Sequence, residues 1–212
     1  MTVFINQELQ SQNYNQVRGE KMEKLKRKLF LDFDNCIVAS ISKICDLYNI
    51  EFANHPKFKF AKWYLCESYN FIEVCPLADC DKIYSYFNQP EFFVGLEFVE
   101  NALEVITRLS ETFEIIVVSL GFQQNLELKE LWLKENLKCM TKFIGCDLDK
   151  YHSKSHIDMS ENGSVFVDDD EHNLETSNCL SLVCFGDLYE WNKKWNGIRM
   201  FNWTDLERFL TE

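Results

Sequence analysis

The feature that most constrains the fold is a repeated pattern: a short apolar segment ends in polar or acidic residues, and helical patterns lie between such segments. The apolar segments lie at residues 28–34, 114–119, 141–145, 164–170 and 181–187. The helical patterns lie at residues 101–109, 125–137 and 171–178. Short apolar strands that alternate with helices are typical of βαβ units, in which helices cover both faces of a parallel sheet. The sequence therefore predicts an α/β fold with a Rossmann-like parallel sheet.

One stretch interrupts this alternation directly after the first predicted strand. Residues 38–96 have helical character and contain all three prolines of the chain. Thirteen of the 31 aromatic residues also lie in this stretch. We expect a small helical cap over the carboxyl ends of the strands. The predicted organisation is a flexible N-terminal extension (1–27), a core (28–37 and 97–212) and the inserted cap (38–96).

The charge of the chain argues against several classes of partner. Lys and Arg number 22 against 34 Asp and Glu, which gives a net charge of −12. Such an acidic protein repels phosphate backbones and anionic lipids, so we expect neither general nucleic-acid binding nor membrane binding. An anionic substrate would need a local cation. We find no signal-peptide pattern, P-loop motif or dinucleotide-binding motif, and we expect a cytoplasmic protein.

The nine cysteines are an odd number and form no CxxC motif. Several of them lie in apolar runs, which is typical of reduced thiols that pack as small hydrophobic side chains inside a protein. A zinc site formed by Cys66, Cys75 and Cys80 is the alternative.

Candidate functional side chains gather where the predicted strands end. Asp32 and Asp34 end the first strand, and Asp168 and Asp169 end a later one. Residues i and i+2 of a strand point to the same side, so Asp32 and Asp34 converge on one point. Two such carboxylates repel each other unless a cation lies between them or one is protonated, and both cases suit catalysis. The alternative is that Asp34 or Asn35 only caps the following helix.

Two further positions suit the binding of a phosphoryl group. Ser119 ends an apolar strand, where its hydroxyl and the backbone N–H groups that follow, beginning with Leu120, can hold a phosphoryl oxygen. Lys154 could neutralise both a phosphate and a carboxylate nucleophile, although a loop lysine is more often a solvated surface residue. The carboxylate pair Asp168 and Asp169 suits a hard cation such as Mg²⁺.

These residues, in this order, resemble the haloacid dehalogenase (HAD) superfamily of aspartate-nucleophile phosphatases. The first motif is FLDFDNCIV, the second IIVVS, the third Lys154 and the fourth VFVDDDEHNL. The segments PEFFVGLEFVENALEVI and SKSHIDM…VFVDD resemble more narrowly the 5′(3′)-deoxyribonucleotidase branch and its bacterial and phage relatives.

The resemblance implies a Mg²⁺-dependent phosphomonoester hydrolase that forms an aspartyl-phosphate intermediate. Its substrate would be a small phosphorylated metabolite, a nucleoside monophosphate. Asp32 would be the nucleophile and Asp34 the acid/base, while Ser119, Leu120 and Lys154 would bind the phosphoryl group. The implied metal ligands are Asp32, Asp34 through its backbone carbonyl, and Asp169, with Asp168 assisting. Phe92 or Phe93 would lie against the base.

Three residues depart from the family pattern, and they leave other functions open. Asn35 replaces a common Gly, Cys36 replaces a common Thr, and Asp170 stands where the nucleotidases tend to have Arg. The first alternative is therefore a catalytically weak or inactive phosphate- or nucleotide-binding module. The second is a response-regulator receiver domain, although the order of its acidic pair, hydroxyl and lysine differs from the order here. The sequence predicts no oligomeric state.

Overall fold

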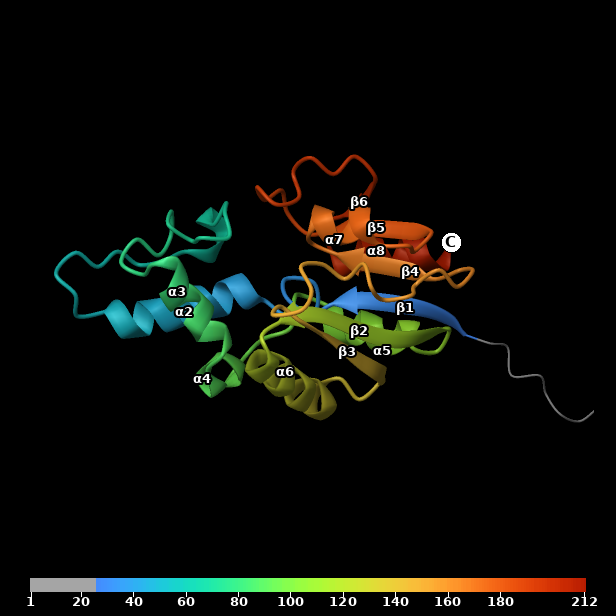
Figure 1. The fold of residues 1–212 in the computed structure, drawn as a ribbon, viewed down its shortest axis with the longest axis horizontal. Coiled ribbons are helices and arrows are strands. Elements are labelled where there is room, and N and C mark those ends of the chain that lie inside the picture. The colour runs from blue at the N-terminus through green and yellow to red at the C-terminus, as the bar shows by residue number, and fades with distance from the viewer. Residues whose placement is uncertain (1–25) are drawn as a thin grey trace, which may run out of the picture.

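The computed structural model describes residues 26–212, and its core is a six-stranded parallel sheet (Figure 1). The strands are β1 (Arg27–Asp32), β2 (Phe113–Gly121), β3 (Met140–Asp147), β4 (Val165–Asp168), β5 (Ser181–Phe185) and β6 (Ile198–Met200). Their order across the sheet is β3-β2-β1-β4-β5-β6, and every neighbouring pair is parallel. The predicted α/β fold with a Rossmann-like sheet is confirmed.

Helices alternate with the strands as the sequence predicts. They are α5 (Ala102–Leu109), α6 (Gln123–Asn136), α7 (Glu171–Thr176) and α8 (Trp203–Thr211). Strand β6 and helix α8 are not among the elements predicted from the sequence. Strand β6 is a three-residue edge strand without a buried residue, so it lacks the apolar run that marks the inner strands. Helix α8 is amphipathic, with Trp203, Leu206 and Leu210 buried, and this spacing is the signal that could have revealed it.

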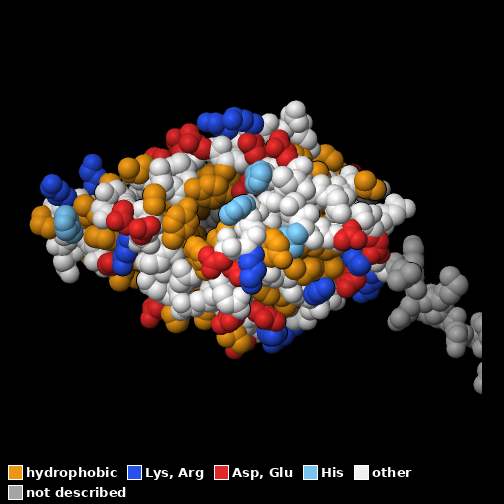
Figure 2. Space-filling model, in the orientation of Figure 1, with side chains coloured by type: hydrophobic (Ala, Val, Ile, Leu, Met, Phe, Trp, Pro, Cys, Tyr) orange, Lys and Arg blue, Asp and Glu red, His pale blue; other side chains and the backbone are white. Residues whose placement is uncertain are grey.

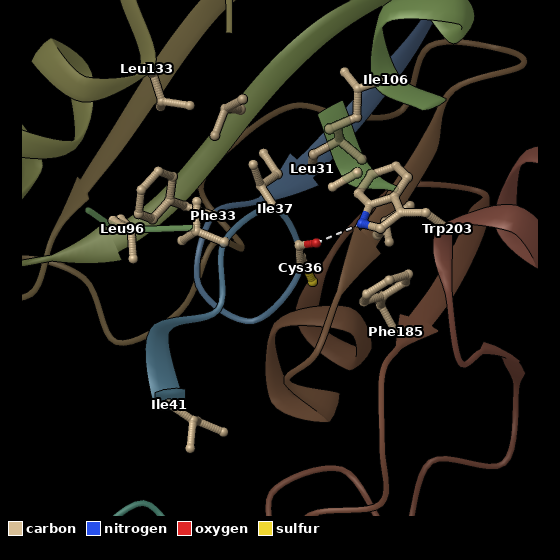
Figure 3. Close-up of a cluster of buried hydrophobic side chains, with 14 of the residues drawn as sticks. Leu31, Phe33, Cys36, Ile37, Ile41, Leu96, Ile106, Leu133, Phe185 and Trp203 are labelled. Carbon is tan, nitrogen blue, oxygen red and sulfur yellow. Dashed lines mark hydrogen bonds between the residues drawn. The ribbon is translucent and has the colours of Figure 1, made fainter. Parts of the chain in front are cut away.

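The two faces of the sheet are both buried, and alternate residues of β1 contact different helices. Leu29 and Leu31 belong to the cluster that includes the buried sides of α5 and α8, whereas Phe30 belongs to the cluster that includes Leu174 of α7. Trp203 of α8 is fully buried, and its Nε1 donates a hydrogen bond to the backbone carbonyl of Cys36 (2.9 Å; Figure 3). This bond anchors the loop after β1, which carries the first motif.

The segment between β1 and α5 forms a helical cap beyond the carboxyl end of β1, on the left of Figure 1. It contains α2 (Ser40–Phe52), η1 (Trp63–Leu65), α3 (Cys80–Phe87) and α4 (Pro90–Phe93). We call residues 38–96 the cap segment. It has apolar side chains of its own to bury, such as Tyr48, Tyr86 and Phe92. The domain boundaries at 37/38 and 96/97 stay a prediction.

Several expectations concern the chain as a whole. The predicted extension, residues 1–27, lies outside the described residues except for Lys26 and Arg27, and Arg27 begins β1. No helix in the described part of the chain is long and apolar enough to span a membrane. All nine cysteines are free, and seven of them are buried. Within residues 26–212, Cys66, Cys75 and Cys80 do not come together as a three-ligand metal site.

Candidate active site

The strand order places the candidate residues at one edge of the sheet. The chain reverses its direction of winding between β1 and β4, and ligands of open α/β sheets bind in the crevice outside the carboxyl ends of the strands at such a point. Asp32 ends β1 and Asp168 ends β4, on the two sides of this reversal. Ser119 and Leu120 lie near the end of β2, the other neighbour of β1.

Lys154 links the ends of β1 and β4. Its side chain is 1% exposed, and its Nζ donates hydrogen bonds to Asp32 Oδ1 and to Asp168 Oδ2 (2.6 Å). It is therefore not a solvated surface lysine. Burial raises the pKa of Asp32 to about 7, against the opposing charge of Lys154 and with the help of the neighbouring carboxylates Asp168 and Asp34. The charge of the Lys154 ammonium group therefore opposes the effect of burial and favours the ionised form of Asp32.

Both carboxylate oxygens of Asp34 are held by hydrogen bonds. Ser40 Oγ at the start of α2 donates to Oδ1 (2.6 Å), and Lys129 Nζ of α6 donates to Oδ2. Lys129 also donates to Ser119 Oγ (2.9 Å). It therefore connects the predicted acid/base with the predicted phosphate-binding hydroxyl. This arrangement orients Asp34 rather than leaving it as a simple helix cap.

Lys129 is not among the site residues predicted from the sequence. It lies in the segment ELKELW, which reads as a charged helical surface. However, its side chain is 1% exposed, and it is three residues from buried Leu126 and four from buried Leu133. Residues at this spacing share one helix face, so Lys129 is on the buried face of α6. A lysine within an apolar helical stripe is the signal that could have identified it.

The two neighbouring carboxylates at the end of β4, Asp168 and Asp169, accept hydrogen bonds from different donors. Asp168 Oδ1 accepts hydrogen bonds from the Asp170 backbone N–H (2.9 Å) and from Asn173 Nδ2 (3.4 Å), so both Asp168 oxygens have protein donors. Asp169 Oδ2 accepts from Asn35 Nδ2 (3.3 Å) and from Trp191 Nε1 (3.1 Å). Trp191, like Lys129, was not predicted. Both donors approach the same oxygen of Asp169, which leaves Oδ1 for another partner.

The buried carboxylates fit a divalent cation. One ligand atom each from Asp32, Cys36 and Asp169 lies within 4.8 Å of the other two. Burial, together with the charges of Asp32 and Asp168, raises the pKa of Asp169 well above its usual range. Oxygen ligands of this kind suit Mg²⁺. Burial and the charges of Asp169, Asp32 and Asp168 raise the pKa of the Cys36 thiol well above its usual range, which favours its neutral form.

A cavity of about 280 Å³ lies over these groups. Asp32, Asp34, Leu120 and Lys154 line its polar floor. Its aromatic residues are Tyr69, Phe71, Tyr84, Phe87, Phe122 and Trp191. Four of these six come from the cap segment. Figure 2 shows hydrophobic side chains gathered around a hollow where the cap segment meets the sheet.

The structure does not bring Phe92 or Phe93 to this cavity. Phe92 is fully buried and packs against Phe87, with ring centroids 5.1 Å apart, and against Phe93 at the same distance. Phe87, at the end of α3, is the ring of this cluster that lines the cavity. The segment predicted to contact a base therefore supports a cavity residue from behind, and it does not line the cavity itself.

A family model matches the chain over residues 26–211, and its description is "5′ nucleotidase, deoxy (Pyrimidine), cytosolic type C protein". The chain belongs to this family. It is therefore a HAD phosphatase of the 5′-nucleotidase family, a group that is typically Mg²⁺-dependent, and the predicted resemblance and enzyme class are confirmed. No curated protein matches the chain.

Solved structures show the same fold at low sequence identity. A predicted phosphatase from Clostridium acetobutylicum has a TM-score of 0.60 and 13% identity, with 88% of this chain and 99% of that chain covered. A haloacid dehalogenase-like hydrolase from Streptococcus pneumoniae has a TM-score of 0.57 and 11% identity, with 88% and 99% covered. YfnB from Bacillus subtilis, described as a HAD-type hydrolase bound to magnesium, has a TM-score of 0.51 and 11% identity, with 89% and 100% covered.

Two departures from the pattern of the 5′-nucleotidase family have a structural basis. Asn35 has φ of 55°, a left-handed conformation that Asn tolerates better than most residues, so it can replace the common Gly. Its side chain also accepts from the Ile41 backbone N–H (3.1 Å) and donates to Asp169. Asp170, in place of the common Arg, accepts from the His172 backbone N–H (2.8 Å) and so caps α7.

Proposed function

We propose that this member of the 5′-nucleotidase family hydrolyses nucleoside monophosphates with Mg²⁺ through an aspartyl-phosphate on Asp32. The observation that carries the proposal is the position of Asp32 and Asp34 on the floor of one cavity with aromatic walls. Lys154 and Lys129 orient these two carboxylates separately, so each can have its own role. A nucleophile and an acid/base are what a two-step phosphoryl transfer needs.

In the first step, an oxygen of Asp32 attacks phosphorus while the bond from phosphorus to the ester oxygen breaks. Asp34, protonated at this stage, gives its proton to the leaving alcohol. In the second step, Asp34 takes a proton from water, the water oxygen attacks phosphorus, and the bond to Asp32 breaks. The two steps together return Asp32 to its free carboxylate and Asp34 to its protonated form. Lys129 donates a hydrogen bond to Asp34 and so holds its carboxyl group in position through both steps.

The remaining polar groups bind the phosphoryl oxygens and the cation. Lys154 offsets negative charge beside Asp32, and we assign a phosphoryl contact to the backbone N–H of Leu120, which lines the cavity near the end of β2. Mg²⁺ would be held by Asp32, Asp169 and the backbone carbonyl of Asp34, and it supplies electrostatic stabilisation of the phosphoryl oxygens. Asp168 has protein donors on both oxygens, and we assign it to the support of Lys154.

The aromatic walls favour a flat, neutral base as the group beyond the phosphate. Stacking of a base on one aromatic ring contributes roughly 1–3 kcal/mol. Tyr84, Phe87 and Phe122 have no place in the acid–base chemistry and are the rings that we assign to this contact. A triphosphate would be disfavoured by the net charge of −12. The substrate is thus a small metabolite, and the family description supports a cytoplasmic location.

The test is phosphate release from a panel that contains nucleoside monophosphates, nucleoside triphosphates and a ring-free alkyl phosphate, each with Mg²⁺ and with chelator. Asp32→Asn protein, purified in the same way, controls for contaminating phosphatase. We expect Mg²⁺-dependent release, with the largest kcat/KM for a nucleoside monophosphate. Equal kcat/KM for the alkyl phosphate would overturn the substrate class and leave the phosphatase intact.

The competing function is a binding module with weak or no turnover, which Cys36 and Asp170 favour as departures from the family pattern. The same panel separates the two. If no phosphate is released from any substrate, but a nucleoside monophosphate binds in a calorimetric titration, the binding module is the correct function.

A further inference from the structure

Two aromatic side chains join the cap segment to the sheet beside the candidate active site. Tyr69 lies in the cap segment, between η1 and α3, and its ring stacks on Trp191, with centroids 4.1 Å apart and planes 20° apart. Trp191 lies between β5 and β6 and stacks on Tyr189 at 4.3 Å. These two connecting segments approach each other in Figure 1. The rings thus form a stack of three that crosses from the cap segment to the sheet.

Hydrogen bonds reinforce this stack. The Tyr69 hydroxyl donates to Asp170 Oδ2 (3.0 Å), and the Glu190 backbone N–H donates to the Glu67 backbone carbonyl (3.0 Å). The contact therefore includes a ring stack, a hydrogen bond to a carboxylate and a backbone bond. All three lie within a few residues of Tyr69 and Trp191. A contact with this many parts favours one relative position of the cap segment and the sheet.

Trp191 connects this contact to the candidate metal site. It is 8% exposed, and its Nε1 donates to Asp169 Oδ2 (3.1 Å). The face of the ring therefore touches the cap segment, while its edge holds a proposed metal ligand. Asp170, which receives the Tyr69 hydroxyl, directly follows Asp169 in the chain. Partners that hold a ligating carboxylate orient it and strengthen metal binding.

We propose that Trp191 is a positioning residue that aligns Asp169 for the divalent cation, and that its stack with Tyr69 makes this alignment depend on the cap segment. The inference rests on the proposed function in one respect, the use of Asp169 as a metal ligand. Because coupling between two sites is reciprocal, the cation then also stabilises the stacked position of the cap segment. The proposal also gives a reason for Asp170 in place of the common Arg, because Asp170 accepts the hydrogen bond from the Tyr69 hydroxyl.

The first test is a calorimetric titration of the full chain with magnesium chloride, without substrate. Trp191→Phe keeps a ring for the stack and removes the N–H donor, and we expect the dissociation constant for Mg²⁺ to rise about tenfold. The matched control is Trp195→Phe. Trp195 lies in the same connecting segment, and its Nε1 donates to the Ile198 backbone carbonyl (2.9 Å), not to a candidate ligand. We expect this control to bind Mg²⁺ as the unchanged protein does.

The second test separates a coupled contact from two independent ones. Tyr69→Ala removes the stack and the hydrogen bond to Asp170, and we expect Mg²⁺ binding to weaken about fivefold. Tyr64→Ala, at an exposed tyrosine of the same cap segment, is the control. When Tyr69→Ala is added to Trp191→Phe, its effect should largely disappear, because the connection from the ring to Asp169 is already lost.

The inference is overturned if Mg²⁺ affinity is unchanged in Tyr69→Ala, or if Tyr69→Ala has the same effect with and without Trp191→Phe. If Trp191→Phe protein does not fold, unchanged affinity in Tyr69→Ala still overturns the proposal. Failure of the proposed function looks different. In that case the unchanged protein binds Mg²⁺ and shows the variant effects, but it releases no phosphate from the substrate panel.

Discussion

The floor and the walls of the cavity differ in how their side chains are held. On the floor, Asp32, Asp34 and Lys154 have short polar contacts to buried partners. In the walls, Tyr84 and Phe122 are 48% and 43% exposed and contribute mainly ring surface. A buried charge that loses its partner strongly destabilises the protein. The loss of one exposed ring removes only the contacts of that ring. Substitutions on the floor should therefore abolish catalysis, and those in the walls should change substrate affinity.

The largest expected effect is that of Asp32→Asn on the floor. The change removes the nucleophile and a proposed metal ligand but almost no volume, so the protein should fold. We expect kcat to fall at least about a thousandfold, as for the loss of a covalent nucleophile. Circular dichroism verifies the fold, and phosphate release gives the rate. Substantial activity in a folded Asp32→Asn protein would contradict the covalent mechanism.

A smaller effect on the floor is expected for Lys129→Met, which keeps an unbranched side chain, one atom shorter, and removes its charge. Without the ammonium group, Asp34 and Ser119 lose a shared donor, and we expect kcat to fall about a hundredfold, the lower end of a general acid–base contribution. Lys134→Met on the same helix is the control, because Lys134 is exposed and its ammonium group pairs with Glu130 at the helix surface. Equal rates for the two variants would remove Lys129 from the mechanism.

In the walls, Tyr84→Ala should raise KM for a nucleoside monophosphate about tenfold and leave kcat nearly unchanged, because one stacking ring is lost. A ring-free alkyl phosphate should show no change in KM. The contrasting variant is Phe92→Ala. Its ring is fully buried, so we expect a loss of about 3–5 kcal/mol in the free energy of unfolding, measured by urea denaturation. A nucleotide-specific rise in KM only for Phe92→Ala would restore Phe92 as the base contact.

The smallest effect expected is on thermal stability. Saturating Mg²⁺ should raise the melting temperature of the unchanged protein by roughly 5 °C, because the cation offsets the repulsion among Asp32, Asp168 and Asp169. Ca²⁺ should also raise it but support less turnover, because its coordination is looser. Asp169→Asn should reduce the shift. Melting curves that coincide with Mg²⁺ and with chelator would exclude the metal site.

The residue pattern by itself predicted five of the six strands and the carboxylates at the cavity floor. Apolar runs that end in acids, as at Asp32 and Asp168, are local features, and parallel strands necessarily bring their carboxyl ends to one edge. The family motifs then added Lys154, whose loop position alone is uninformative. For the strand-end residues, the local sequence that marks the end of the strand also marks the position of the site. Little tertiary information is therefore needed to predict them.

Only the tertiary structure decided which residues from separate elements meet at that edge. Lys129 lies 95 residues from Asp34 along the chain, and Trp191 lies 22 residues from Asp169. Whether Tyr84 or Phe92 faces the cavity likewise depends on how the cap segment packs over the sheet. Periodicity predicts that a side chain is buried on one face, but not which partner it finds there. The partner depends on how elements distant in sequence pack against each other. That packing must bury apolar surface and pair the buried charges at the same time.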